Sequence, residues 1–510
     1  MKEIINGSEL HEKIIEAVNM ICDAVSSTLG PCGNNVLINT DDKSPYITND
    51  GVSIAQAIES NDKIINTILE IIKEASLKTN EEVGDGTTTT LVLLKSIIND
   101  GIKEIRNGKN AFILASELNK ALEKTIKLLE TFKVKPSKTN MLEIARTSAN
   151  DKEIGNIVYE VFNKLKNKNS IKITENNSYK TYYEIKKGYI LDIDNIPNIY
   201  FTKSKEIKIN NAYIFIIRGY LNDLEQISDI INESIERNKN IILLVEDYNE
   251  IINEQIILYK VKDNKNIYLF KTPDYGLRKI DIEEDISILT NATIKNIDYE
   301  NISFNDFGTC DIVINKENII IVNENNNIKN RVKELKKLLK KDISDYDKDF
   351  ILNRISYLTK GIAYIYVGGN SKTEIKEKIM RFEDSINSIS NSYNGIVYGE
   401  GITYLKLSNK LDKTIQAEKI IKNALNKPFQ KIFENSGIDY SNILNEIINS
   451  NYNKLYNFET NNFENINETQ IIDPYIVEKY ALINAISISS ILLTTNYLVI
   501  NENLKEKLEI

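Results

Sequence analysis

The stretch Glu82-Val-Gly-Asp-Gly-Thr-Thr-Thr-Thr90 places a carboxylate between two glycines and follows it with four hydroxyl side chains. Glycines let a backbone approach a ligand closely, and the free N–H groups at the start of a helix attract anions. A single Asp can hold the Mg²⁺ that accompanies a nucleotide. The stretch therefore predicts a phosphate and metal site at a helix start. The same residue types also cap helices without any ligand, and at this point that alternative stays open.

The residues behind this stretch predict the helix itself. Apolar side chains recur there at helical spacing and indicate one buried stripe, formed by Leu91, Leu94, Ile98, Ile102 and Ile105. A Walker phosphate loop is excluded, because no Gly-Lys-Ser/Thr follows the glycines.

The composition excludes several kinds of chemistry. A net charge of -9 speaks against a nucleic-acid binder, since no basic surface is available to neutralise a phosphate backbone. His11 is the only histidine, and Cys22, Cys32 and Cys310 have no metal-binding spacing. Zinc sites, Ser-His-Asp triads and Cys-His nucleophiles are therefore excluded. Any chemistry must use carboxylates, hydroxyls, backbone groups and a bound metal.

The chain start and the hydropathy bear on location. Residues 1–10 carry acidic side chains and no apolar core segment, and no stretch reaches the roughly 18 uninterrupted apolar residues of a membrane span. We expect no targeting signal and no membrane partner. The expected location is the cytoplasm, or the stroma or matrix of an organelle that encodes the protein.

The periodicity of the apolar residues changes character twice along the 510 residues, which are enough for several domains. Residues 10–131 and those after 395 are typical of long helices, the last of them an apolar helix over 477–493. Between about 170 and 360, helices such as 221–237 and 249–259 alternate with short β-type runs at 212–217, 241–245, 267–270 and 311–315. This pattern predicts a helical domain built from both chain ends, with an α/β domain inserted.

Eight short motifs occur in one order along the chain, and together they resemble a group I chaperonin, the GroEL family. The motifs are Thr28-Leu-Gly-Pro31, Ile47-Thr-Asn-Asp-Gly-Val-Ser53, Gly84-Asp-Gly-Thr-Thr-Thr89, Thr147-Ser-Ala-Asn150, Asp285-Ile-Ser-Ile-Leu-Thr290, Gly361 to Gly368, Arg381-Phe-Glu-Asp-Ser385 and Ile472-Asp-Pro474. Each motif alone is a weak signal, and the ordered set is specific.

The resemblance implies a multidomain α+β fold of the GroEL type. Its parts would be a mostly helical equatorial domain from residues 1–131 and 395–510, a small α/β intermediate domain from 132–180 and 363–394, and an α/β apical domain at 181–362. The implied partners are unfolded polypeptides and a co-chaperonin ring of the GroES family. The implied assembly is two stacked heptameric rings, without nucleic acid or membrane.

The resemblance also assigns roles to matching residues, with ATP and Mg²⁺ as cofactors. Asp85 is expected to bind Mg²⁺, Asp384 to orient the water that attacks ATP, and Asp50 to be a second carboxylate near that water. The residues expected around the nucleotide are Thr28, Leu29, Gly30, Pro31, Gly86, Thr87, Thr88, Thr89, Gly399, Glu400, Asn457, Phe458 and Asp473. Those expected to bind unfolded polypeptides are Leu224, Ile227, Ile231, Ile257 and Leu258.

Ordinary structural explanations stand beside these roles. Asp384 lies opposite the apolar stripe of its own helix, so from that helix alone its carboxylate is expected to be exposed and solvated. Asp473 precedes Pro474, a common start of a helix. Each of the five apolar residues of the apical domain can equally pack its helix onto the sheet.

Some positions depart from the family pattern. Glu400 stands in Gly399-Glu-Gly401 where three glycines are usual, Phe458 replaces a small residue, and Asn49 and Cys32 replace lysines. The departures imply altered ATP affinity or turnover.

The sequence thus predicts an ATP-dependent chaperonin subunit that encloses non-native proteins for folding. One alternative is a degenerate chaperonin that assembles and binds nucleotide without productive folding. The other is an actin-like phosphotransferase with an Asp-Gly-Thr phosphate loop.

Overall fold

A computed structural model describes residues 2–40, 43–166, 168–176, 178–186, 188–193, 196–201, 206–263, 266–316, 318–323, 325–341, 344–466 and 468–501. The chain forms two compact units. Unit 1 comprises Met1–Phe162, Glu175–Thr181 and Val367–Ile510, and unit 2 comprises Asn163–Thr174 and Tyr182–Tyr366. The five-segment division predicted from the sequence stays a prediction.

Unit 1 is mostly helical and draws its helices from both ends of the chain. These are α1 (Gly7–Ser26), α2 (Gly51–Ala57), α3 (Lys63–Val83), α4 (Thr87–Arg106), α5 (Ala111–Glu130), α6 (Lys138–Ala149), most of α7 (Lys152–Leu165), α13 (Lys372–Ser392), α14 (Ile402–Ser408), α15 (Gln416–Leu425), α16 (Lys427–Ser436), α17 (Tyr440–Asn449) and α18 (Tyr475–Thr494).

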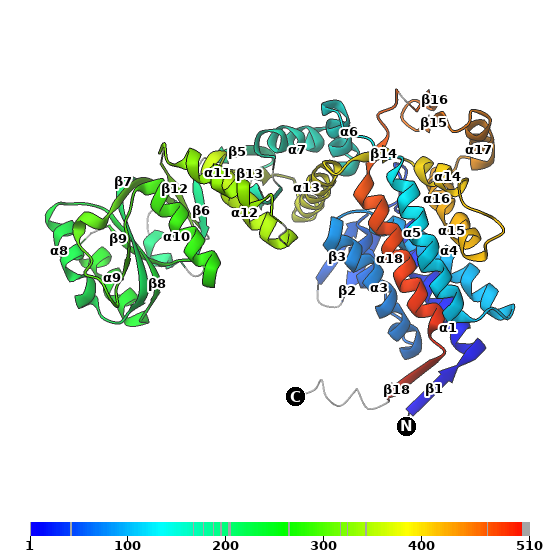
Figure 1. Ribbon diagram of the computed structural model, residues 1–510, viewed down its shortest axis with the longest axis horizontal. Helices are drawn as coiled ribbons and strands as arrows, with labels where there is room; N and C mark the ends of the chain where they lie inside the picture. The colour runs from blue at the N-terminus through cyan, green and yellow to red at the C-terminus, as the bar shows by residue number, and fades with distance from the viewer. Residues whose placement is uncertain are drawn as a thin grey trace. The chain divides into compact units, whose positions relative to one another are not determined.

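The core of unit 1 is organised around α18, which packs against α3, α4 and α5 (Figure 1). The predicted apolar helix over 477–493 is confirmed as this element. Among the described helices, α18 alone is long and apolar enough to cross a membrane by length and composition, and more than half of it is buried inside the unit. Burial on most sides explains why it is apolar nearly all round.

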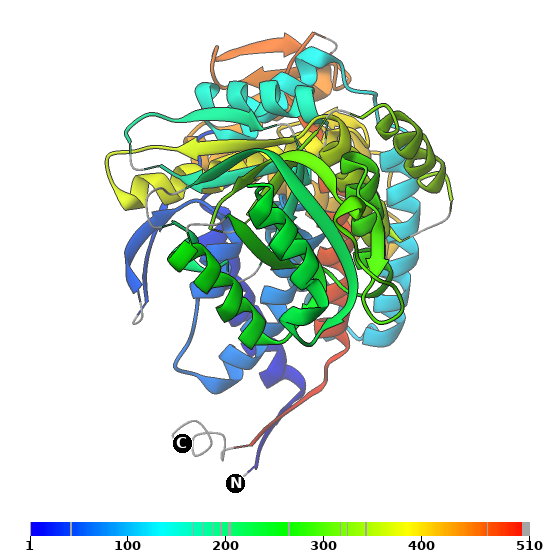
Figure 2. The same ribbon diagram turned by 90° about the vertical axis from the view of Figure 1, so that its left-hand side faces the viewer.

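Short two-stranded sheets complete the described part of unit 1. They pair β1 (Lys2–Asn6) with β18 (Tyr497–Asn501), β2 (Val36–Thr40) with β3 (Lys43–Thr48), β14 (Ile396–Tyr398) with β17 (Ile472–Pro474), and β15 (Lys454–Asn457) with β16 (Asn462–Asn465). The strands of the two chain ends, β1 and β18, run side by side in both views (Figure 1 and Figure 2).

Unit 2 is an α/β unit built on two sheets in its described residues. The larger sheet has the strand order β6 (Tyr189–Asp192), β12 (Asn318–Val322), β11 (Gly308–Ile314), β7 (Ile207–Leu221), β8 (Ile241–Tyr248) and β9 (Ile267–Lys271), with β10 (Ile294–Asn296) also pairing with β7. The smaller sheet has the order β4 (Ile171–Glu175), β13 (Ile362–Val367) and β5 (Tyr182–Lys186). Strands β7, β8 and β9 are parallel, and β11 joins β7 antiparallel.

Helices cover both faces of the larger sheet. The described helical elements that lie wholly in unit 2 are η1 (Lys168–Ser170), η2 (Asn198–Phe201), η3 (Leu224–Ile227), α8 (Ser228–Glu236), α9 (Glu250–Asp263), α10 (Gly276–Thr290), η4 (Phe304–Asp306), α11 (Ile328–Leu338) and α12 (Asp345–Thr359). Alternate residues of β8 enter two cores: Leu243 packs with α8 and α9, whereas Leu244 packs with α10, α11 and α12. Successive side chains of the strand point to opposite faces of the sheet, and both faces are buried, so the sequence of such a strand is a continuous apolar run.

The elements predicted from the sequence are largely confirmed. Three of the β-type runs lie within β7, β8 and β9, and the fourth, 311–315, extends one residue beyond β11. The predicted helix 249–259 begins one residue before α9 and otherwise lies within it. The helix predicted over 221–237 is corrected, because β7 continues to Leu221 and the helical part begins only at Leu224, as a 3₁₀ turn.

Candidate nucleotide site

The Gly-Asp-Gly stretch forms the junction between α3 and α4. Gly84 ends α3 with a φ of 65°, and Gly86 precedes α4 with a φ of 79°. Both values are left-handed, a conformation that favours glycine. A Cβ on Gly86 would also lie 2.6 Å from Val477 Cγ1. The predicted helix start is therefore confirmed, with Thr87 as the first residue of α4.

Asp85 is fixed between the two glycines by two donors. The Gly86 N–H donates to Asp85 Oδ1 at 2.6 Å, and the Ser388 hydroxyl donates to Oδ2. Burial raises the pKa of the Asp85 carboxyl above its ordinary value, and the nearby Asp50 adds to the rise. A cation at this carboxylate would therefore be favoured by charge.

Asp50 caps the start of α2, and this start meets the start of α4. Asp50 accepts hydrogen bonds from the backbone N–H groups of Val52 at 3.2 Å and Ser53 at 2.9 Å. A Cβ on Gly51 would lie 2.7 Å from Thr87 Oγ1 and 2.6 Å from Thr88 Oγ1. The N-terminal ends of two helices thus lie side by side, and both attract negative charge.

Thr28 lies on the other side of the same junction, since its Oγ1 is 3.4 Å from Thr88 Oγ1. The next residues are held by α16: Asn435 Nδ2 donates to the Leu29 carbonyl at 2.9 Å, and a Cβ on Gly30 would lie 3.0 Å from Ile432 Cγ2. Pro31 is exposed. The segment from Thr28 to Pro31, expected around the nucleotide, is therefore anchored beside the junction through Thr28.

The expectation that Asp384 is exposed is corrected. Its side chain is only partly accessible, and burial raises the pKa of its carboxyl well above the ordinary value, with further contributions from Asp85, Asp50 and Glu383. The position opposite the apolar stripe of α13 faces the Gly-Asp-Gly junction and is partly shielded from water. Three carboxylates, those of Asp50, Asp85 and Asp384, thus converge from separate parts of unit 1.

Asp473 extends this acidic group. It sits on β17 opposite Val397 of β14, and burial, with Asp85 as the next cause, raises the pKa of its carboxyl. A Cβ on Gly399 would lie 3.1 Å from Asp473 Oδ2. Gly399 and Asp473, both expected around the nucleotide, therefore lie together.

Glu400 combines a strained backbone with a buried carboxyl group. Its φ of 55° is left-handed, a conformation that costs a residue with a side chain about 1–2 kcal/mol. Its Oε2 is buried and accepts no hydrogen bond from the described residues. Burial raises the pKa of Glu400 well above the ordinary value, and Asp473 and Glu464 add to the rise.

Asn457 is the last residue of β15, and Phe458 follows it in the turn of the β15–β16 hairpin. Asn457 Nδ2 donates to Glu464 Oε1 at 2.6 Å, and Phe458 packs against Phe433, with ring centroids 4.8 Å apart. Asn457 Oδ1 accepts from the backbone of Glu459 at 2.8 Å, so much of its bonding capacity serves the turn.

Some residues of the site were missed by the sequence analysis. Ser388 contacts Asp85 directly. Burial raises the pKa of Glu478, in the first turn of α18, well above its ordinary value, and the nearby Asp473 adds to the rise. Ser388 follows Asp384 by four residues, so it lies on the same helical face and could have been found from that spacing. The sequence indicates that Glu478 lies near Asp473 only through their short separation along the chain.

The donor set fits Mg²⁺ held mainly by a ligand's phosphates. In the described part of the chain no group of three or more His, Cys, Asp or Glu side chains is arranged to hold a metal ion by itself. Mg²⁺ is usually bound by one or two carboxylates together with substrate phosphates and water. Asp85, beside the free N–H groups of α4, suits that arrangement.

The residues predicted to bind unfolded polypeptides are only partly accessible in unit 2. Ile227 and Ile231 are each 1% exposed and belong to the core beneath α8, so their prediction as surface residues is corrected. Leu224 and Ile257 are partly buried, and Leu258 is 48% exposed. The periodicity identified the apolar stripe correctly, but that stripe faces the sheet.

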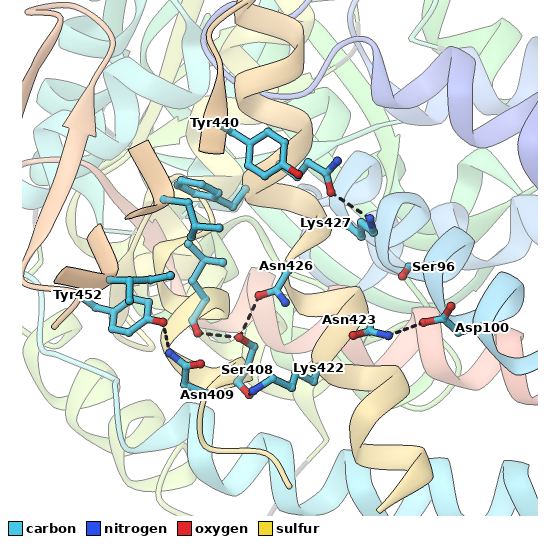
Figure 3. A pocket seen from close by; sticks show the side chains of 15 residues that line it. Ser96, Asp100, Ser408, Asn409, Lys422, Asn423, Asn426, Lys427, Tyr440 and Tyr452 are labelled. Atoms are coloured by element: carbon cyan, nitrogen blue, oxygen red, sulfur yellow. Dashed lines mark hydrogen bonds between the residues drawn. The ribbon is translucent and has the colours of Figure 1, made fainter. Parts of the chain in front are cut away.

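A separate hollow of about 440 Å³ opens among α4, α14, α15, α16 and α17 (Figure 3). Its polar lining includes Asp100, which accepts from Asn423 Nδ2 at 2.8 Å. None of the residues predicted to hold a nucleotide lines it. Its size alone does not make it the functional site, because the carboxylates and helix starts converge elsewhere.

Comparison with known proteins identifies the family. A sequence model described as the TCP-1/cpn60 chaperonin family matches residues 21–503. The chain belongs to this chaperonin family. Its structure is similar to two crystal structures of the chaperonin gp146 from the bacteriophage EL 2 (Pseudomonas aeruginosa), both obtained in the presence of ATP-BeFx. Each match has 21% sequence identity and covers 98% of this chain and 99% of the other, with TM-scores of 0.71 and 0.65.

The likeness to these chaperonin structures shows the fold. The predicted GroEL-like multidomain α+β fold is therefore confirmed, and so is the resemblance to a GroEL-family chaperonin. An actin-like phosphotransferase is no longer supported, because the family match covers nearly the whole chain.

Proposed function

We propose that this chaperonin binds and hydrolyses ATP with Mg²⁺ and uses the cycle to enclose non-native proteins for folding. The observation that carries the proposal is the convergence of Asp50, Asp85 and Asp384 beside the starts of α2 and α4. Helix starts favour phosphates, and carboxylates favour a divalent cation and a polarised water.

Each part of the site has a distinct task in this proposal. Bound Mg-ATP supplies the reactive phosphoanhydride and a cation that offsets the phosphate charge. Asp85 offers an oriented carboxylate for the cation, and Thr87, Thr88 and Thr89 offer N–H and hydroxyl groups for the phosphates. Asp384 holds the attacking water and receives its proton, with Asp50 as a second acceptor. Asp473, Gly399 and Asn457 lie at the end proposed for ribose and base.

The raised pKa of Asp384 suits this task. A carboxylate among like charges is a stronger base than a solvated one, provided that it is ionised when the water attacks the phosphate. A cation held at Asp85 would favour that ionised form.

The surface proposed for unfolded polypeptides is the exposed side of α9. Ile251 and Leu258 are seven residues apart, so they share one helical face, and their side chains are 60% and 48% exposed. An exposed apolar face of this kind attracts extended apolar segments without a strict sequence preference. The same face would serve a co-chaperonin ring of the GroES type.

Assembly into two stacked heptameric rings is part of the proposal. Two ribbons of unit 1 support self-assembly: Leu37 pairs with Ile47 across β2–β3, and Ile4 pairs with Val499 across β1–β18. These side chains are 51% to 68% exposed. A two-stranded ribbon has free edges and is marginal alone, so pairing between copies of the chain would stabilise both.

The test of the proposed function has three parts. Electron microscopy of the purified protein should show rings, release of phosphate from ATP should require Mg²⁺, and a chemically denatured client should regain activity with ATP and a co-chaperonin. Absence of ATP binding by the assembled protein would refute the proposal.

Glu400 favours a second candidate, a chaperonin that assembles and binds nucleotide without productive folding. Its buried carboxyl and left-handed backbone stand beside Asp473, at the end proposed for ribose. Rings that bind ATP but recover no client under any nucleotide condition would support this candidate, and recovery would exclude it.

A further inference from the structure

Three polar side chains of α13 reach the junction between α3 and α4. Asn391 Nδ2 donates to the Val83 carbonyl at 2.5 Å, Asn387 Nδ2 to the Gly84 carbonyl at 3.5 Å, and the Ser388 hydroxyl to Asp85 Oδ2. Three successive residues of the junction therefore each have a partner on one helix. We call Asn387, Ser388 and Asn391 the latch.

The junction is shaped to receive the latch. The carbonyls of Val83 and Gly84 lie at the end of α3, where backbone acceptors lack partners within the helix. Without α13 they would depend on water. A Cβ on Gly84 would lie 2.4 Å from Asn387 Nδ2, so the missing side chain at Gly84 is what lets α13 approach this closely.

The latch is itself held by α6. Ser148 Oγ donates to Ser388 Oγ at 3.0 Å, and Ser385 Oγ donates to the Ala145 carbonyl at 2.8 Å. Ser388 is 1% exposed, and Ser385 is fully buried. Because Ser388 accepts from Ser148, its own proton is free to be directed at Asp85. Hydroxyl orientation thus passes from α6 through Ser388 to the Asp85 carboxylate.

We propose that the latch is a positioning device that holds α13 on the Gly-Asp-Gly junction and fixes the rotamer of Asp85. Asp384 lies on the same helix, so one docking event places both the metal-side and the water-side carboxylates. The inference rests on the proposed function, in which these carboxylates act on Mg-ATP. Ser388 and the Gly86 N–H each use one lone pair of Asp85, which leaves the others for a cation.

The latch is tested first in nucleotide-free protein, by hydrogen–deuterium exchange of the amides of residues 83–90. Ser388→Ala and Asn391→Ala should each raise the exchange rates there by about threefold or more, since each removes one docking hydrogen bond. Ser390→Ala, on the same helix and with no described side-chain hydrogen bond, is the matched control. Unchanged exchange in both latch variants relative to this control overturns the inference.

A second measurement separates a latch from general packing. In an Asp85→Ala background, Ser388→Ala should add little to the exchange rate, whereas two independent packing defects would add fully. Isothermal titration with Mg-ATP should show about tenfold weaker binding for Ser388→Ala, the usual effect of losing a hydrogen bond to a charged group. Full additivity in the double variant also counts against the latch, and so does an unchanged affinity in Ser388→Ala if wild type binds Mg-ATP.

Failure of the latch and failure of the proposed function give different results. If wild-type protein binds no Mg-ATP while the exchange pattern holds, the latch stands and the nucleotide proposal falls. If wild-type protein binds Mg-ATP and the exchange pattern fails, the reverse conclusion follows. Asn391 is only partly buried, so Asn391→Ala keeps the test valid if Ser388→Ala unfolds the protein.

Discussion

Asp384 lies among like charges and has no ion-pair partner in the described part of the chain; Asp85 and Asp50 are its strongest charged neighbours. Asp384→Ala should lower the turnover of ATP by about 100-fold or more, the usual range for a lost general base. The affinity for Mg-ATP should be unchanged or slightly higher, because a repelling charge is removed. Phosphate release and calorimetric titration measure the two quantities.

Glu383→Ala is the matched control for this prediction, because Glu383 is the neighbouring carboxylate and is exposed. Its turnover should stay within about threefold of wild type, because Glu383 is exposed and its charge is the weakest of the three that act on Asp384. Equal losses in both variants would mean that helix disturbance, not the Asp384 carboxylate, limits the rate.

Glu400 makes stability depend on pH. Its pKa is raised in the folded protein, so the folded state binds this proton more tightly than the unfolded chain does. The stability that this group contributes is therefore full below its ordinary pKa of 4.5 and is lost as pH rises through the folded pKa. Glu400→Gln cannot ionise. We expect it to match wild type near pH 5 and to be more stable at pH 8.

Denaturant unfolding at several pH values between 5 and 8 measures this difference. The exposed Glu459→Gln is the control and should run parallel to wild type, since its side chain is 76% exposed. Parallel curves for Glu400→Gln and wild type would show that the Glu400 carboxyl is not isolated from water.

At single residues, the chemical role of a side chain was easier to predict from the sequence than its surroundings in the fold. The glycines at 84 and 86 and the roles open to Asp85 follow from residue type, because few residues adopt a positive φ. The environment of Asp384 does not follow, since the loop that covers it lies some 300 positions earlier in the chain. A helical wheel shows which side a residue takes, and only the fold shows what covers that side.

On the scale of elements, α10, α11 and α12 are joined by one buried carboxylate. Asp285 is fully buried and accepts from Arg331 Nε at 2.8 Å, from Arg354 Nε at 2.6 Å and from the Tyr189 hydroxyl at 3.1 Å. Asp285→Ala leaves two guanidinium groups without this partner, so it should destabilise unit 2 by about 3–5 kcal/mol. Native-state hydrogen exchange of the β7 and β8 amides measures the loss.

Glu233→Ala provides the comparison, because it removes an exposed ion pair with Arg237 on α8. That loss should stay below about 1 kcal/mol. If the two variants cost the same, the buried network contributes no more than a surface pair.

The elements themselves were predictable where periodicity was strong, as in α4, α18 and the strands of the larger sheet. The helix predicted over 221–237 began too early, because β7 is 15 residues long and ends only at Leu221. The sequence at the end of β7 also fits a helix. Ile227 and Ile231 show a related limit. Their spacing predicts an apolar stripe, but a stripe that packs onto a sheet and a stripe that binds a partner have the same sequence pattern.

On the scale of the whole molecule, the ribbons β2–β3 and β1–β18 are surfaces that a single chain leaves uncovered. Leu37→Asp places a charge on an apolar position that is already 68% exposed, so the subunit itself should lose less than about 0.5 kcal/mol of stability. In an assembly the same charge would be buried without a partner, a penalty of several kcal/mol at every ring contact. We therefore expect Leu37→Asp to be a folded single subunit at concentrations where wild type forms rings. Sedimentation velocity distinguishes these species, and Ile251→Asp on α9 is the control, since it adds the same charge at a 60% exposed apolar position in unit 2 and should leave the rings intact. Rings of unchanged size and stability in Leu37→Asp would exclude the β2–β3 ribbon from the contact between subunits.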